Sequence, residues 1–494
     1  MQPGCGKAGR VMQADELTGL IELDACALSG AIARREVSAR EVMAACLARI
    51  ERLNPRVNAL VGLLPHEALL QQADQRDAML ARGRSMGWMH GFPMAIKELS
   101  AVAGLPLSLG SPLLAGQIAA HDSLMVARMK AAGGIVIGKS NVPEFGLGSH
   151  TYNPVFGTTL NPWDTARSAG GSSGGAAVSL ALRLQPVADG SDMMGSLRNP
   201  AAWNNVFGLR PSLGRVPTNP HAGDGYVALL GTEGPMGRSV RDVAMLLSVQ
   251  AGHDARQPLS IAQDGSAFAR PLRPAARGLR VGWLADLGGH LPFEPGILPL
   301  CEAALRRFET LGAHVEPLAL GYSCDEVWQT WLTWRRFLVA GTLGPLGANP
   351  RTRARLKPEA QWEYDQGQGL SGPQVYAASS ARTRFYRHMV ALFERFDLLV
   401  LPSAQVWPFP AEWSWPREIA GRTMDTYHRW MEVVIYATLA GLPAISVPVG
   451  FNDDGLPMGM QLIGPPLGEQ GVLNAAAAYE QSIGELLARR PALG

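Results

Sequence analysis

The pattern of apolar and polar positions predicts that the chain begins with helices. Residues 37–55, VSAREVMAACLARIERLNP, place apolar side chains four residues apart on one helical stripe. Ser38 and Glu41 have the spacing of a capping box, which marks the start of a helix. Pro55 is expected to end it, because proline cannot continue the hydrogen-bond ladder.

Further along, short apolar runs alternate with amphipathic segments. Continuous apolar runs are typical of strands buried on both faces, and helices between them predict a mostly parallel sheet covered on both sides. The fold class expected is therefore α/β. The runs that predict strands are 90–99, 135–140, 279–287, 314–320, 396–402 and 443–451, and the helical segments between them include 123–134 and 298–313.

Composition and charge narrow the class of protein. The chain has 494 residues, 47% of them hydrophobic and 17% charged, which is enough apolar material for a large core. The net charge is +2 and no long basic run occurs, so neither nucleic acid nor a membrane is an expected partner. The five cysteines form no C-x-x-C pair, which favours reduced thiols and no structural metal. The N-terminal residues lack an apolar signal core, so a cytoplasmic location is expected.

Two motifs match known patterns in the wrong structural context. GGIVIGKS, residues 133–140, fits the P-loop pattern, but its β-branched middle favours a strand over a phosphate-binding loop. Gly170, Ser172 and Gly174 fit the nucleophile elbow G-x-S-x-G, yet a turn-rich loop precedes them where the elbow requires a strand. A Gly/Ser linker is the third alternative for this stretch.

The residues that follow favour an active site. A helical run and a short strand separate the Gly/Ser stretch from a second small-residue turn, which contains Ser196. A helix and a strand can fold back and bring two such turns together, with backbone N–H groups gathered around the hydroxyls of Ser172 and Ser196. Lys97 stands alone in an apolar strand and is the candidate base. A lysine that extends its ammonium to the surface is an equal alternative on spacing alone.

From about residue 38 to residue 480, the chain resembles the amidase signature family. The blocks that carry the resemblance are HGFPMAIKE, GKSNVPEFG, NPWDTARSAGGSSGGAA, SDMMGSLRNPAA, GLRPSLGRVP, AGLPAISVPVGF and GLPMGMQLIGPP. The resemblance implies an α/β/α sandwich around a large mixed sheet, and hydrolysis of C–N bonds other than peptide bonds without a metal or other cofactor. It also implies one catalytic domain over 1–494, with a helical region at 1–80, a catalytic core at 85–250 and a more variable pocket wall at 285–440.

Site roles follow from the same resemblance. It implies that Ser196 is the nucleophile, that Ser172, after a cis peptide bond, relays the proton, and that Lys97 is the base. The implied oxyanion hole consists of four backbone N–H groups, those of Met193, Met194, Gly195 and Ser196. A serine needs such a base, and burial must keep the lysine neutral for it to act.

The chain departs from the family pattern at three places. Met194 replaces the usual glycine, so position 194 is expected to avoid a positive φ. Glu98 replaces the usual aspartate. Asn199 stands where glutamine-specific amidotransferase subunits of this family have glutamine. This difference weakens the alternative that the chain is such a subunit. Asp192 and Arg198 are expected to form a buried pair that holds the nucleophile turn.

The tryptophans bear on the substrate. Trp328, Trp331 and Trp334 recur every third residue and are expected in the core, whereas the Pro-rich loop around Trp407 favours a pocket wall. The residues expected to contact the substrate are Gly148, Met194 and Trp407. An aromatic wall favours neutral aryl or alkyl amides, with carbamates as an additional class. Two alternative functions remain: an amidotransferase-type subunit that needs a partner protein, and a catalytically inactive scaffold. The oligomeric state also stays open, and a homodimer is one possibility.

Overall fold

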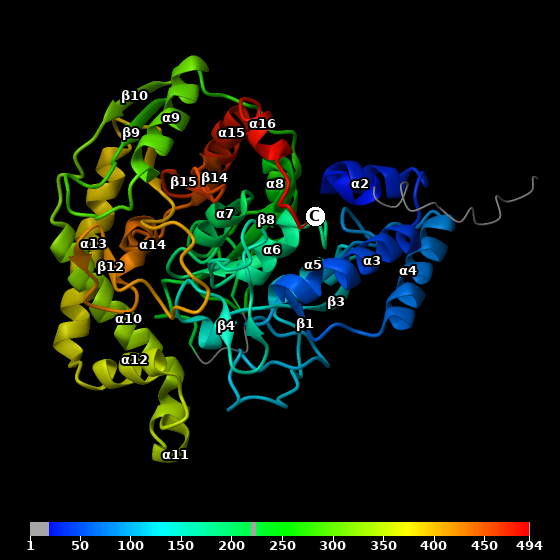
Figure 1. Ribbon diagram of the computed structural model, residues 1–494, viewed down its shortest axis with the longest axis horizontal. Helices are drawn as coiled ribbons and strands as arrows, with labels where there is room; N and C mark the ends of the chain where they lie inside the picture. Colours follow the sequence, from blue (N-terminus) through cyan, green and yellow to red (C-terminus); the bar gives the residue numbers. More distant parts are fainter. Residues whose placement is uncertain (1–18, 219–223, 494) are drawn as a thin grey trace, which may run out of the picture.

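The computed structural model describes residues 19–218 and 224–493 (Figure 1). The first part of the described chain contains the helices α2 (Ala25–Ala33), α3 (Ala39–Val57) and α4 (His66–Ala81). The capping box predicted at Ser38 is present, and Pro55 lies inside the last turn of α3, so the predicted end is wrong by two residues. The helix ends instead at Asn58, whose left-handed conformation turns the chain. The first part of the predicted helical region, residues 1–18, lies outside the described residues.

An eight-stranded sheet forms the centre of the molecule. Its strands, in spatial order, are β10 (His314–Pro317), β9 (Arg280–Trp283), β11 (Leu398–Pro402), β15 (Pro457–Ile463), β14 (Ala444–Phe451), β7 (Phe207–Arg210), β8 (Thr232–Gly237) and β6 (Ala188–Asp192).

The sheet is mixed, as the resemblance implied, but the expectation that most of its strands run parallel is wrong. Only the pairs β10–β9 and β9–β11 are parallel, and the other five neighbouring pairs are antiparallel. A strand buried on both faces has the same apolar pattern whichever way its neighbour runs. Burial therefore identified the strands without fixing their directions.

Helices cover both faces of this sheet. The α-helices after α4, in chain order, are α5 (Leu124–Ala131), α6 (Gly174–Ala181), α7 (Arg198–Asn204), α8 (Val240–Gln250), α9 (Ile297–Thr310), α10 (Cys324–Gly347), α11 (Pro350–Arg353), α12 (Pro358–Gln368), α13 (Gly372–Leu392), α14 (Ile435–Leu439), α15 (Glu469–Glu480) and α16 (Gly484–Ala488) (Figure 1). On one face of the sheet, α8 packs on β8 and α15 packs on β14 and β15, and these two helices contact each other. Helix α7 packs on β7, β14 and β15.

Smaller sheets lie beside the large one. β1 (Leu60–Val61) pairs antiparallel with β3 (Ile135–Ser140), and β3 pairs parallel with β2 (Pro93–Lys97). The segment that matched the P-loop pattern is thus a strand. Two further two-stranded ribbons are β4 (Tyr152–Asn153) with β5 (Gly157–Thr158), and β12 (Glu418–Ile419) with β13 (Arg422–Thr423).

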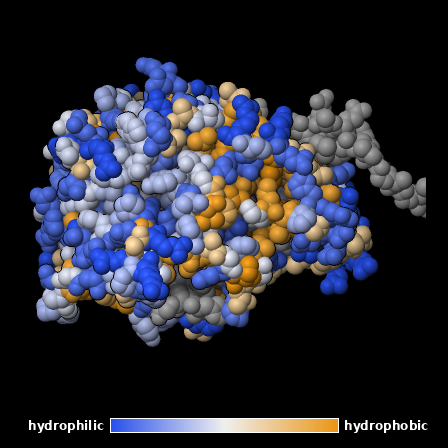
Figure 2. Space-filling view, turned by 60° about the horizontal axis from the view of Figure 1, so that its bottom comes forward, coloured by the Kyte–Doolittle hydropathy of each residue, from blue (hydrophilic) through white to orange (hydrophobic). Residues whose placement is uncertain are grey.

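The three tryptophans of α10 lie in the core, as predicted. Trp328, Trp331 and Trp334 are at most 5% exposed. The face shown in Figure 2 has hydrophobic residues gathered in a band, with hydrophilic residues on either side of it. None of the described helices combines the length and the apolar character needed to cross a bilayer.

Candidate active site

The two predicted turns meet in space. Ser172 lies just before α6, and Ser196 lies between β6 and α7. The backbone N–H of Ser173 donates to the carbonyl of Ser196 at 3.2 Å, which joins the turns directly. The peptide bond between Gly171 and Ser172 is cis, as the resemblance implied.

Glycine is required in both turns for steric reasons. Gly195 has a φ of +78°, and a Cβ there would lie 2.8 Å from a methyl group of Val434. A Cβ at Gly174 would lie 2.2 Å from the hydroxyl oxygen of Thr151. Met194 has no positive φ, as expected, so the methionine is accommodated in the nucleophile turn without the left-handed conformation that glycine favours.

Lys97, the last residue of β2, is fully buried and reaches the Gly/Ser turn and the end of β6. Its Nζ lies 2.9 Å from Ser172 Oγ and 2.7 Å from Ser173 Oγ. Ser191, at the end of β6, contributes its hydroxyl at 2.9 Å and its carbonyl at 3.2 Å. The alternative of a lysine that reaches the surface is therefore wrong.

Burial decides the ionisation of this lysine. Removal from water disfavours the ammonium and lowers the pKa of Lys97 to about 7, while the carboxylates nearby only partly oppose the effect. The closest of these is Asp189, whose two oxygens both accept the backbone N–H of Lys97 at 3.2 Å. A substantial fraction of Lys97 is thus neutral near pH 7 and can accept a proton.

The nucleophile turn presents backbone donors toward the cavity. Within the described part of the chain, the N–H groups of Met193, Met194 and Ser196 donate to no protein atom. The N–H of Gly195 is different, because it already donates to the carboxylate of Asp192 at 2.9 Å. The structure therefore offers three free donors for an oxyanion, and the inclusion of Gly195 among the predicted four is corrected.

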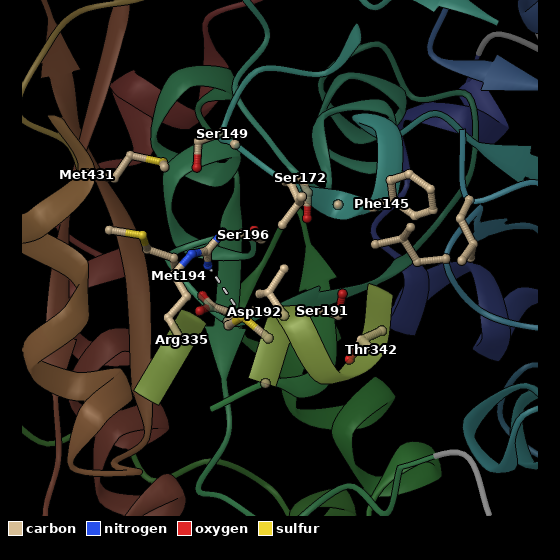
Figure 3. Close-up of a pocket in the computed structure, with 18 of the residues that line it drawn as sticks. Phe145, Ser149, Ser172, Ser191, Asp192, Met194, Ser196, Arg335, Thr342 and Met431 are labelled. Atoms are coloured by element: carbon tan, nitrogen blue, oxygen red, sulfur yellow. Dashed lines mark hydrogen bonds between the residues drawn. The ribbon is translucent and has the colours of Figure 1, made fainter. Parts of the chain in front are cut away.

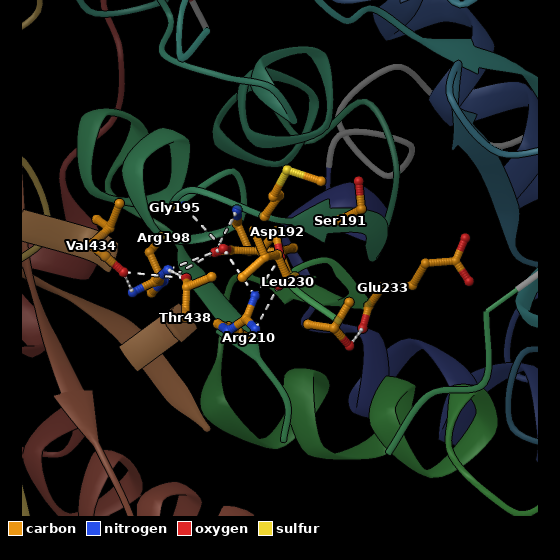
Figure 4. Close-up of polar contacts among 12 residues, drawn as sticks. Ser191, Asp192, Gly195, Arg198, Arg210, Leu230, Glu233, Val434 and Thr438 are labelled. Carbon is orange, nitrogen blue, oxygen red and sulfur yellow. Dashed lines mark hydrogen bonds and ion pairs between the residues drawn. The ribbon is translucent and has the colours of Figure 1, made fainter. Parts of the chain in front are cut away.

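Asp192 and Arg198 form the buried ion pair that the sequence predicted (Figure 4). Arg198 binds both of its oxygens at 3.0 Å, and Arg210 donates to its backbone carbonyl. Burial alone would raise the pKa of Asp192, but the two guanidinium groups hold it well below its usual range. Arg198 also donates to the carbonyl of Val434 and the hydroxyl of Thr438, so the pair anchors the turn to the helical segment that contains α14.

A cavity of about 240 Å³ opens over the serines (Figure 3). Ser172 and Ser196 both line it. No hydrogen bond joins their hydroxyls in the described structure, although both belong to one wall. Most of the other lining side chains are apolar, and they are Leu99, Leu109, Phe145, Leu147, Met193, Met194, Val339, Leu343 and Met431.

Two of the three predicted substrate contacts lie at this cavity. Gly148 and Met194 line it, but Trp407 does not. The indole N–H of Trp407 donates to the carbonyl of Pro295 at 3.1 Å, and its backbone N–H donates to Glu294. These bonds hold the tryptophan against a different loop, so its assignment to the pocket wall is corrected.

Sequence reasoning missed several residues of the site. The sequence pattern favours only a turn role for Ser173 and gives none to Ser191, yet both contact Lys97. Arg335 of α10 also lines the cavity, as does Met431. The signal for Ser191 was available, because it lies one residue before Asp192 on the strand that leads to the nucleophile. Nothing in the local pattern around Arg335 indicated the cavity. Among the described residues, no group of acidic, histidine or cysteine side chains is arranged to hold a metal ion.

Comparison with known proteins gives a consistent picture. The Amidase family model matches residues 41–473. The chain is 33% identical over 477 residues to a glutamyl-tRNA(Gln) amidotransferase subunit of Cyanothece sp., covering 91% of this chain and 95% of that protein. It is 32% identical over 473 residues to an acylamidase of Rhodococcus erythropolis, covering 93% and 95%. Among solved structures, a bacterial aryl acylamidase of the amidase signature family superposes with a TM-score of 0.87 at 31% identity, covering 95% of this chain and 99% of the other.

Proposed function

The chain belongs to the amidase signature family, and we propose that it hydrolyses neutral aryl and alkyl amides, with carbamates as a second substrate class, through a serine acyl-enzyme. The observation that carries this proposal is the contact of 2.9 Å between Lys97 Nζ and Ser172 Oγ, beside the cavity that Ser196 also lines.

In the first step, Ser196 Oγ attacks the substrate carbonyl carbon. Its proton passes to Ser172, whose own proton passes to neutral Lys97; one hydroxyl must first turn toward the other. The carbonyl π electrons move to oxygen, and the free N–H groups of Met193, Met194 and Ser196 stabilise the resulting anion.

In the second step, the tetrahedral intermediate collapses and the C–N bond breaks. Lys97 returns its proton through Ser172 to the leaving nitrogen, so a neutral amine departs. Water then repeats the sequence on the ester to Ser196 and releases the acid. With a carbamate, loss of the amine leaves an alkoxycarbonyl ester on Ser196, which water hydrolyses in the same way.

The lining of the cavity supports neutral substrates. Apolar side chains form most of its wall, and burial of an apolar group there contributes about 25 cal/mol per Å² of surface removed from water. A charged acyl group would have to leave water without a dedicated counter-ion.

An amidotransferase-type subunit is the second candidate function. It is favoured by the 33% identity to the Cyanothece protein. It is disfavoured by the apolar cavity, because glutamine carries two charges on its α-carbon. The third alternative, an inactive scaffold, is disfavoured by the contacts of Lys97 with Ser172 and Ser191 beside the cavity.

The proposal is tested with a neutral anilide, an aryl carbamate and an ester as substrates. Ser196→Ala should lower kcat/KM for all three by about 10⁴-fold or more, because it removes the hydroxyl that forms the acyl-enzyme in the proposed mechanism. Intact-protein mass spectrometry should detect an acyl adduct on the wild type and none on the variant. Ser248→Ala on α8 is the matched control and should keep wild-type rates. Undiminished turnover by purified Ser196→Ala protein would refute the proposal.

A further inference from the structure

One charged side chain of the cavity has no part in the proposed mechanism. Arg335 comes from α10, is 3% exposed and lines the cavity. In Figure 3 its side chain points in among the labelled cavity residues. Of the lining residues that the structure describes, Arg335 is the only cation. A buried arginine in a mostly apolar wall therefore requires a physical explanation.

The hydrogen bonds of Arg335 leave part of its donor capacity unused. Its Nε donates to Glu363 Oε1 at 2.5 Å, one Nη donates to the Tyr427 hydroxyl at 2.7 Å, and the other contacts Met193 Sδ at 3.4 Å. A guanidinium has five N–H groups in fixed directions, two of them on each Nη. Two N–H groups of Arg335 thus have no acceptor in the described part of the chain.

The charge of Arg335, in contrast, is already compensated. Glu363 is fully buried, and its Oε1 also accepts a hydrogen bond from the Tyr427 hydroxyl at 2.7 Å. The pair of Arg335 and Glu363 is therefore neutral as a unit. A carboxylate that bound Arg335 would add a second anion beside Glu363 in a poorly solvated site, whereas a neutral oxygen would bring no such repulsion.

We propose that Arg335 forms a polar subsite that binds a neutral hydrogen-bond acceptor in the substrate, away from the scissile bond. Suitable acceptors are a ketone, ether, or second amide or carbamate oxygen. This inference rests on the proposed function, because it concerns what the same cavity selects. A substrate without such an oxygen excludes water from Arg335 and leaves its two N–H groups unpaired, which costs about 10- to 100-fold in affinity.

Matched compounds isolate this effect. On the acyl side, the anilide of 4-oxopentanoic acid has a ketone where that of 4-methylpentanoic acid has a methyl branch and succinanilic acid has a carboxylate. On the amine side, 3-acetyl-, 3-isopropyl- and 3-carboxyacetanilide form the same series. We expect the wild type to prefer the ketone over the apolar analogue by about tenfold or more in kcat/KM, in one of the two series. The carboxylate should be the poorest member of that series.

Variants connect the preference to Arg335. Arg335→Met alone would leave Glu363 buried without a partner, so the informative protein is the double variant Arg335→Met/Glu363→Met, which removes the ion pair as a unit. The ketone preference should fall to about one in the double variant, since no donor remains. Arg336→Met is the matched control, because Arg336 is the next residue of α10, stacks on Trp362 and does not line the cavity. It should keep the wild-type preference.

The dissociation constants of the same compounds, measured by calorimetry in a Ser196→Ala background, give a readout that does not depend on turnover. If no compound is hydrolysed by the wild type, the proposed function fails, and these constants still test Arg335. Equal binding of ketone and apolar analogue in both series would overturn the subsite, as would a ketone preference that survives in the double variant or a preference for the carboxylate. Should the double variant not fold, Arg335→Lys must weaken the ketone preference, and an undiminished preference in that variant would count against the subsite.

Discussion

At the scale of single residues, the ionisation of Lys97 should set the pH range of the proposed reaction. Burial lowers its pKa to about 7, and only the neutral amine accepts a proton. Below that pH the lysine is protonated, and the rate should fall about tenfold for each unit; above it the rate should be level. We therefore expect kcat/KM for a neutral anilide to show one acid limb with an apparent pKa near 7.

The measurement is a pH profile with a substrate that does not titrate between pH 5 and 10. Lys97→Arg is the control, since a guanidinium stays protonated throughout and the variant should be inactive at every pH. An acid limb near 4 would point to a carboxylate base, and one near 10 to a solvated lysine; either would contradict the role of Lys97.

The residues that we propose as catalytic could be located from the sequence because they lie in motifs. Ser172 and Ser196 each lie in a turn of small residues, and Lys97 interrupts an apolar run. Arg335 was not accessible, because it lies about 140 residues after the nucleophile and only the packing of α10 against the catalytic turn brings it there. Trp407 shows the opposite error: its loop composition favoured a pocket wall, but its hydrogen bonds to Pro295 and Glu294 place it elsewhere.

At the scale of elements, Gln461 joins three segments behind the nucleophile turn. It lies on β15 and is fully buried; its amide N–H₂ donates to the carbonyls of Pro402 and Val433 at 3.0 Å, and its oxygen accepts from Arg198 at 2.5 Å. Gln461→Leu would remove one buried hydrogen bond from each of these three partners. We expect the free energy of unfolding to fall by about 2–4 kcal/mol.

Arg198 keeps its two bonds to Asp192 in this variant, so kcat/KM of the folded enzyme should change by less than about tenfold. Denaturant unfolding and assays at low temperature separate the two effects. Gln470→Leu, on the partly buried face of α15, is the control and should change stability by less than about 0.5 kcal/mol. Unchanged stability of Gln461→Leu would show that this junction does not hold the sheet to α7.

The sequence pattern predicted where strands lie more successfully than how they pair. β3 has the predicted bounds, and β14 differs by one residue. The directions were missed although one signal was present: Asp454-Gly455 lies between β14 and β15, and such a pair flanked by apolar runs is typical of a hairpin. Strand order depends on contacts between distant segments, which a local pattern does not contain.

At the scale of the whole molecule, segments far apart in the sequence come together to line the cavity. The nucleophile turn forms one side, the segment around Phe145 another, and α10, with Val339 and Leu343, a third. Helices α10 and α12 pack against each other, and Lys357 before α12 donates to the carbonyl of Leu147 on the opposite wall at 2.9 Å. The helical segment after residue 320 thus contributes one wall of the site.

This architecture predicts that the purified chain hydrolyses a neutral anilide alone and has little glutaminase activity. Free glutamine brings an α-ammonium and an α-carboxylate, and each must be paired when it leaves water. Asp192, the one carboxylate among the described lining residues, is already paired with two arginines, and Arg335 is paired with Glu363. We expect kcat/KM for the anilide to exceed that for glutamine by at least about 10³-fold, measured as aniline and ammonia release from the same preparation.

Ser196→Ala should abolish both activities and thereby exclude a contaminant. If the chain alone were inactive on anilides but released ammonia from glutamine once amidotransferase partner proteins were added, the cavity would have been assigned to the wrong substrates, and the second candidate function would replace the first.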